Sequence, residues 1–237
     1  PSRAMVSPSD RSITTVTRLA YQLHTSVPAD RWCVTFVDLD FLREEVQAAV
    51  ATTLIQPPAN STDDFEPSDK DYGPSIYTVN EQYIKPVTMK AGKMSWALMR
   101  NPHGLVCDLF ISHAWQEGVF EFLSKVRHSW PAGVRTAWCC MLANPQNLDI
   151  ASFLHSPSSS PFAVALRASE VMLVVPNRHQ SVYTRLWCAY EAYLAQEEGK
   201  TILIAKSSNW RDILGALQWM VVAASLGGFL GTIATLL

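Results

Sequence analysis

The sequence predicts an α/β fold in which crossover helices cover a parallel sheet. In the second half of the chain, short runs of β-branched and aliphatic residues alternate with longer stretches of helical spacing. A segment rich in Pro, Asp and Ser separates this half from a less regular N-terminal half. With 237 residues, of which 48% are hydrophobic and 17% charged, the chain can bury a sizeable core.

The composition also limits the classes of function. A net charge of −2 and the lack of a dense Lys/Arg run exclude a basic nucleic-acid surface, so we expect no nucleic-acid partner. The chain opens on Pro1 rather than Met, as expected of a fragment. The cysteines lack paired C-x-x-C spacing, which indicates a reduced, intracellular setting without structural zinc. We expect no bound metal or cofactor. They are Cys33, Cys107, Cys139, Cys140 and Cys188.

The N-terminal region, 1–55, is predicted to be partly helical. Residues 32–37 are strand-like, and 41–54 have helical spacing. The apolar positions of this helix are Leu42, Val46, Ala49 and Val50. We expect Asp38 or Asp40 to cap its N-terminus, because short acidic side chains accept hydrogen bonds from the first free N–H groups of a helix.

Two segments join this region to the second half. Residues 56–74, QPPANSTDDFEPSDKDYGP, have the composition of a solvated linker, and we place a domain boundary there. Residues 75–103 alternate weakly between apolar and polar positions. We interpret 75–103 as a lead-in segment that packs against the next domain and carries no chemistry of its own.

Residues 104–212 form the predicted α/β domain. Its predicted strands are 105–111, 134–142, 171–175 and 201–205. Its predicted helices are 116–130, 162–168 and one that Ser181 caps and Gly199 ends. A long loop, 144–161, precedes the second helix. The expected apolar arc of the last helix is Val182, Leu186, Tyr190, Tyr193 and Leu194, with Glu191 at its edge.

Three motifs follow one another in this domain. They are CDLFISHAW at 107–115, ALRAS leading into VMLVVPN, and RLWCAYEAYLA at 185–195. Together they resemble the first strand, third strand and third helix of the Toll/interleukin receptor (TIR) domain family. Asp108, Phe110, Ile111 and Ser112 match the D-x-F-I/L-S strand of that family, and Trp187 with Glu191 matches its W-x-x-x-E helix. The resemblance covers roughly 104–206, under half the chain.

The resemblance implies a flavodoxin-like, three-layer fold with a parallel sheet. It also implies one of two activities. Members of the family either assemble as homotypic signalling modules or cleave the glycosidic bond of NAD with the glutamate of the W-x-x-x-E helix. By resemblance, that glutamate is Glu191.

The expected sheet order predicts a ligand site without help from the family. In the flavodoxin-like order 2-1-3-4-5, ligands bind at the carboxyl ends of the first and third strands. Glu191 is the candidate catalytic residue, because a carboxylate stabilises the oxocarbenium character that develops when nicotinamide leaves ribose. The candidate substrate-binding residues are Ser112, His113, Trp115, Asn177, Arg178, Arg185 and Trp187.

Most of the binding residues have an expected role and a plainer alternative. His113 would serve in the pocket, or else be a loop residue that bonds to the backbone. Trp115 and Trp187 are expected to exclude water and stack on the pyridine ring, or else to be core residues. Arg178 or Arg185 would pair with pyrophosphate, unless its guanidinium is simply solvated. Ser112 would donate a hydrogen bond to ribose.

Two functions of different classes remain open at this point. The first is an NAD glycohydrolase, for which NAD or a related nucleotide is a substrate and Glu191 lines an open cleft. The second is a non-catalytic signalling module that associates with its own kind through the TIR-like surface. In that module Glu191 is a covered or solvated flank of an amphipathic helix.

The C-terminal run 213–237 contains no charged side chain. A helix that spans a bilayer needs about 20 apolar residues, so the run predicts a transmembrane helix. The basic residues before it are Lys200, Lys206 and Arg211. They predict a membrane protein with the TIR-like domain on the cytoplasmic side. The alternative is that 220–223 is a buried fifth strand and 229–237 the last helix of the domain.

Overall fold

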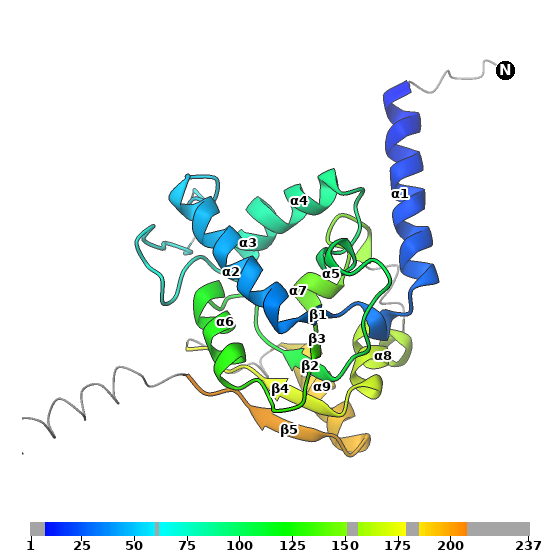
Figure 1. The fold of residues 1–237 in the computed structure, drawn as a ribbon, viewed down its shortest axis with the longest axis vertical. Coiled ribbons are helices and arrows are strands. Elements are labelled where there is room, and N and C mark those ends of the chain that lie inside the picture. Colours follow the sequence, from blue (N-terminus) through cyan, green and yellow to red (C-terminus); the bar gives the residue numbers. More distant parts are fainter. Residues whose placement is uncertain (1–7, 60–61, 151–155, 179–184, 208–237) are drawn as a thin grey trace, which may run out of the picture. The chain divides into compact units, whose positions relative to one another are not determined.

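The computed structural model describes residues 8–59, 62–150, 156–178 and 185–207, with side chains from residue 15 onward. Within these residues the chain forms an α/β fold built on a five-stranded mixed sheet (Figure 1). The chain divides into two units after Lys206, and nearly all of the second unit lies outside the described residues. All helices and strands of the described residues belong to the first unit.

The four predicted strands of the second half are confirmed, although each is shorter than its sequence run. The strands are β1 Val34–Thr35, β2 Leu109–Ser112, β3 Thr136–Cys139, β4 Val171–Val174 and β5 Thr201–Ile204. Their order is β1-β3-β2-β4-β5, with β2 in the centre. β2, β3, β4 and β5 run parallel, whereas β1 pairs antiparallel with β3. The expectation of a wholly parallel sheet is therefore corrected to a mixed one.

The centre of the sheet is covered on both faces, which explains why β2 and β3 contain only buried residues. Successive side chains of a strand point to opposite faces. One face packs with α2 and α6 and includes Leu109, Ile111, Ala137, Cys139 and Leu173. The other face packs with α8 and α9 and includes Phe110, Trp138, Met172 and Val174.

The N-terminal elements are α1 Pro8–Ser26, the 3-10 turn η1 Ala29–Arg31, and α2 Phe36–Ala51. α2 begins directly after β1, earlier than predicted, because Thr35 caps it. The Thr35 hydroxyl accepts a hydrogen bond from the Asp38 backbone N–H (3.1 Å), and the Asp38 carboxylate accepts one from the Thr35 backbone N–H (2.9 Å). The prediction that Asp38 or Asp40 caps this helix is therefore wrong. Asp38 instead completes a capping box with Thr35.

The segment 56–74 is mostly exposed coil that is tied to its surroundings. Asp63 accepts a hydrogen bond from the Ser75 backbone N–H (3.0 Å), and Asp69 accepts one from the Tyr72 backbone N–H (3.0 Å). Phe65 is buried in the core. The described residues on both sides of the segment belong to the same compact unit.

The segment 75–103 is helical in spite of its weak alternation. It contains α3 Ile76–Val79, the π-helix η2 Asn80–Ile84, α4 Lys85–Lys90 and α5 Trp96–Arg100. Ser75 and Ser95 cap α3 and α5 through their hydroxyls. Pro86 is the second residue after the π turn, and a proline ring clashes with the carbonyl four residues before it, here that of Gln82 inside the turn, which accounts for the wider turn there.

The helices of the second half are α6 Val119–His128, α7 Cys140–Ala143, α8 Pro161–Ala168 and α9 Leu186–Glu197, with the 3-10 turn η4 Pro157–Ser159 before α8. α6 and α8 agree with the prediction. Cys140 lies in α7 rather than in the predicted second strand. α9 begins at Leu186, and the predicted cap, Ser181, lies outside the described residues.

The predicted apolar arc of α9 is wrong. Leu186 is 84% exposed and Tyr193 is 59% exposed, and Val182 lies outside the described residues. The buried positions are Cys188, Glu191, Leu194 and Ala195. Cys188 and Ala195 are small and allow the helix to approach the sheet closely. The spacing of large apolar residues alone therefore does not indicate which face of the helix is buried. Glu191 consequently lies on the inward face of α9.

The run 213–237 lies outside the described residues, as do the alternative strand 220–223 and helix 229–237. None of the helices in the described part of the chain combines the length and apolar character that a membrane crossing needs.

Candidate functional site

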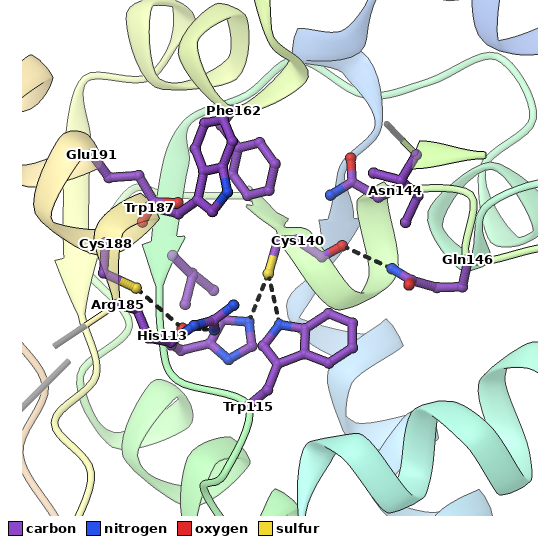
Figure 2. Close-up of a pocket in the computed structure, with 12 residues that line it drawn as sticks. His113, Trp115, Cys140, Asn144, Gln146, Phe162, Arg185, Trp187, Cys188 and Glu191 are labelled. Carbon is purple, nitrogen blue, oxygen red and sulfur yellow. Dashed lines mark hydrogen bonds between the residues drawn. The ribbon is translucent and has the colours of Figure 1, made fainter. Parts of the chain in front are cut away.

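A pocket of about 180 Å³ lies at the carboxyl end of β2, on the sheet face that carries α8 and α9 (Figure 2). Its walls include His113, Trp115, Asn144, Phe162, Arg185, Trp187 and Glu191. An engineered cavity of about 150 Å³ holds benzene, so this pocket has room for one six-membered ring. It therefore fits a ring or a small part of a larger ligand.

Glu191 is the buried acid of this pocket. Its side chain is only 4% exposed, and its Oε2 accepts a hydrogen bond from the Ser112 hydroxyl at 2.5 Å. Ser112 is held in place because β2 is hydrogen-bonded to strands on both sides. Burial raises the pKa of Glu191 to about 7, although the Ser112 hydrogen bond and the positive charge of Arg185 both lower it. Glu191 is therefore poised to gain or lose its proton near neutral pH.

The two candidate arginines lie in different places. Arg185 precedes α9, lines the pocket, and donates a hydrogen bond to the His113 carbonyl at 3.3 Å. Arg178 instead donates to Glu121 Oε1 at 2.8 Å and covers the ring of Tyr72. Neither Arg178 nor Asn177 is among the described residues that line this pocket. Of the two, only Arg185 supplies positive charge to the site.

Two aromatic groups form opposite parts of the pocket wall (Figure 2). Trp187 stacks on Phe162, with ring centroids 5.3 Å apart and planes inclined by 16°. Trp115 donates a hydrogen bond from its indole N–H to Cys140 Sγ at 3.2 Å. Both tryptophans are half-buried, so each contributes to the core and also lines the pocket.

His113 and the neighbouring cysteines are too deeply buried to act as charged groups. His113 Nε2 lies 3.3 Å from Cys140 Sγ. Burial and the nearby Arg185 lower the pKa of His113 to about 3, so the imidazole is neutral at physiological pH. Burial raises the pKa of Cys140 to about 12 and that of Cys188 to about 11. These thiols stay protonated, and a thiolate nucleophile is not expected here.

Sequence reasoning missed Phe162, Cys188 and Asn144 as pocket residues. Asn144 follows α7, which itself follows β3, so it lies at the same sheet edge as the ends of β2 and β4. The rule that ligand sites form at the carboxyl ends of parallel strands applies to β3 as well, and it would have indicated this turn. Among the described residues, no group of three or more His, Cys, Asp or Glu side chains is arranged to hold a metal ion.

The end of the segment interpreted as a linker and the start of the lead-in segment together support the pocket loop. Residues 72–77 pair with the loop that follows β2. The backbone hydrogen bonds are Tyr77 N–H to Trp115 O, Ile76 N–H to Glu117 O, Val119 N–H to Pro74 O, and Phe120 N–H to Tyr72 O. Gly118 is required there, because a Cβ atom at this position would lie 2.4 Å from the Tyr72 carbonyl oxygen. Residues 72–77 thus fix the loop that carries His113 and Trp115.

A second buried polar cluster lies near the start of α6. Lys125 Nζ lies 3.5 Å from Glu117 Oε1 and 3.1 Å from Glu121 Oε1, and it donates a hydrogen bond to the Pro176 carbonyl at 2.5 Å. Glu117 is fully buried. Burial raises the pKa of Glu117 to about 8, although the positive charge of Lys125 lowers it. Glu117 therefore retains its proton at neutral pH.

This cluster predicts that stability falls as the pH rises from 6.5 to 8. Unfolded Glu117 ionises near pH 4.5, whereas the folded protein retains the proton up to about pH 8. The folded state therefore binds more protons in this window, and rising pH favours unfolding. Glu191 acts in the same direction up to about pH 7. Buried His24 and His113 act in the opposite direction, because burial lowers their pKa values, and their effect fades above about pH 7.5, where the unfolded imidazoles are neutral too.

Thermal unfolding at pH 6.5 and 8 measures this effect. We expect the free energy of unfolding to fall by about 1–2 kcal/mol, which corresponds to several degrees in Tm. Glu117→Gln should remove most of the slope, because a neutral amide does not titrate. Glu66→Gln, at an exposed coil position, is the matched control. Equal slopes for wild type and Glu117→Gln would show that Glu117 is ionised in the folded protein.

Comparison with known proteins provides no family for this chain. No family model, no curated protein and no solved structure matches it.

Proposed function

We propose that this protein is an NAD glycohydrolase with a flavodoxin-like, TIR-like α/β domain, in which Glu191 is the catalytic carboxylate. The observation that carries the proposal is the position of Glu191: a buried carboxyl group that faces a ring-sized pocket between aromatic side chains. The parallel order β3-β2-β4-β5 supports the flavodoxin-like part, because it agrees with the expected order 2-1-3-4.

The reaction needs a negative charge next to the ribose C1′ atom. As the bond between C1′ and the nicotinamide nitrogen breaks, its electron pair goes to the ring nitrogen, and neutral nicotinamide leaves. The ribosyl group is left with oxocarbenium character, which ionised Glu191 stabilises or traps covalently. Water then attacks C1′ and loses a proton, so the products are nicotinamide, ADP-ribose and a proton.

The other pocket residues have roles that fit this reaction. The aromatic walls offer stacking surfaces for the pyridine ring and exclude water, which strengthens the electrostatic effect of Glu191. The pocket is too small for a dinucleotide, so the phosphates would lie at its opening, where half-buried Arg185 provides positive charge. The Ser112 hydroxyl donates to Glu191, so Ser112 is a positioning residue rather than the ribose ligand that the sequence suggested.

The second candidate function is a non-catalytic module that self-associates. Two observations favour it. Glu191 is buried and accepts a hydrogen bond from Ser112, and the outer face of α9 is apolar and exposed. Leu186 and Tyr193 expose large apolar side chains on that face, as an association surface requires. This candidate predicts concentration-dependent assembly without turnover of NAD.

The full chain incubated with NAD is expected to release nicotinamide, measured by chromatography. The rate should rise with pH through about 7, because the ionised form of Glu191 is required and its pKa lies there. Ser112→Ala removes a hydrogen bond that favours the ionised form, so the midpoint of the profile should move to higher pH. Ser158→Ala, in an exposed turn, should leave the profile unchanged. If no nicotinamide appears at any pH, the enzyme proposal fails and the association module remains.

A further inference from the structure

Asn144 is a buried amide whose hydrogen-bonding capacity the protein does not use. Its side chain is 4% exposed, yet it makes no hydrogen bond to any described residue. The nearby Gln146 is different, since its amide donates to the carbonyls of Cys140 and Met141, both at 3.3 Å. Asn144 lines the pocket, and its amide atoms are not among those sealed from solvent without a partner, so the amide is available to a group that enters the pocket.

The Asn144 amide points into the pocket. Figure 2 shows it across the pocket from Glu191, with the stacked Trp187 and Phe162 rings between the two positions. A flat ring that lies against these aromatic side chains would therefore have one edge near Glu191 and another near Asn144. On the same side of the pocket, Cys140 accepts the Trp115 hydrogen bond, and the Gln146 amide donates to a backbone carbonyl. His113 also lines the pocket, and its Nδ1 atom has no hydrogen-bond partner among the described residues, but the ring is buried.

We propose that Asn144 is the specificity residue that recognises the carboxamide group of the nicotinamide ring. This inference rests on the proposed function and deepens it. The nicotinamide ring has two polar groups: the ring nitrogen, which bonds to ribose in NAD, and the primary carboxamide. An asparagine amide and a primary carboxamide each hold a donor and an acceptor, so the two groups pair through two hydrogen bonds. Glu191 acts at one end of the ring and Asn144 at the other.

The pairing predicts a defined ligand preference. Nicotinic acid has a carboxylate, which offers no N–H donor and introduces a charge into a buried site. 3-Methylpyridine has neither donor nor acceptor and would leave the Asn144 amide without a partner. A site built for a polar group discriminates strongly against analogues that lack it. The wild-type chain should therefore bind nicotinamide about tenfold or more tightly than either analogue.

The experiment is a titration of the full chain with free nicotinamide, nicotinic acid and 3-methylpyridine, followed by calorimetry or ligand-observed NMR. Asn144→Leu keeps a similar side-chain volume but removes both hydrogen bonds, and it should weaken nicotinamide binding by about tenfold to a hundredfold. Asn147→Leu is the matched control: its amide donates to the Lys85 carbonyl and to Thr88 Oγ1, both at 2.8 Å. It should reduce thermal stability but leave the affinity for nicotinamide unchanged.

The outcomes separate this inference from the glycohydrolase proposal, because binding of free nicotinamide needs no turnover. Tight binding that depends on Asn144, without cleavage of NAD, would support the inference and reject the enzyme. Cleavage of NAD by the wild type, with the same nicotinamide affinity in wild type and Asn144→Leu, would support the glycohydrolase proposal and reject the role of Asn144. If Asn144→Leu does not fold, the comparison of the three ligands on the wild-type chain decides the question. Equal affinities for the three, or no binding of nicotinamide, overturn the inference.

Discussion

Glu191→Gln is expected to lower the rate of nicotinamide release by about a thousandfold or more while the protein stays folded. The glutamine side chain has nearly the same shape, but it cannot carry the negative charge that stabilises the ribosyl cation. Loss of a single stabilising group in an active site costs about a hundredfold to a thousandfold, and loss of a nucleophile costs more. A neutral amide also avoids the cost of ionising a buried acid, so the Tm should not fall at pH 8.

The measurement is kcat/KM for nicotinamide release together with the thermal midpoint of each variant. Glu197→Gln is the matched control, because Glu197 lies at the end of the same helix and is exposed. It should retain the wild-type rate. Equal turnover by the wild type and Glu191→Gln would exclude Glu191 from the mechanism, even if the protein proved to be an enzyme.

Leu173→Asp is expected to unfold the domain. Leu173 is fully buried in β4, opposite Ile111 of β2 and Leu203 of β5, within a cluster of hydrophobic side chains. An unpaired carboxylate there costs more than about 4 kcal/mol, which is a large part of the stability of a typical domain.

Denaturant and thermal unfolding test this expectation. The matched control is Ile204→Asp, which places the same side chain in β5 at a position that is 65% exposed. Its free energy of unfolding should change by less than about 1 kcal/mol. A Leu173→Asp variant with the wild-type midpoint would show that β4 does not form the core of the sheet.

The central strands and the strand-like run at 32–37, which contains β1, could be predicted from the sequence, whereas the antiparallel pairing of β1 with β3 could not. A strand that is buried on both faces appears as a short run of apolar residues, as in VMLVV, and this pattern is visible without the structure. β1 has only two residues, and its pairing with β3 joins residues about a hundred positions apart. The helices in 75–103 were missed because weak alternation was weighed above the serine caps at Ser75 and Ser95, which were readable signals.

The candidate site was predictable in part. The motifs indicated Glu191, but hydrophobic spacing placed the inward face of α9 around Leu186 and Tyr193, which are exposed. The burial of Glu191 depends on a hydrogen bond to Ser112, 79 residues earlier, and local spacing does not report such contacts. Asn144 was not identified because the strand-end rule was applied to the ends of the first and third strands and not to the end of the second.

The pairing between residues 72–77 and the loop after β2 restricts how this protein can be recombined. A gene cut at residue 104 would leave the carbonyls of Trp115 and Glu117 without their backbone partners. It would also remove α2 from one face of the sheet and β1 from the outer side of β3. Residues 104–206 therefore depend on the preceding hundred residues for these contacts. A recombined gene has to keep both parts together to preserve the pocket.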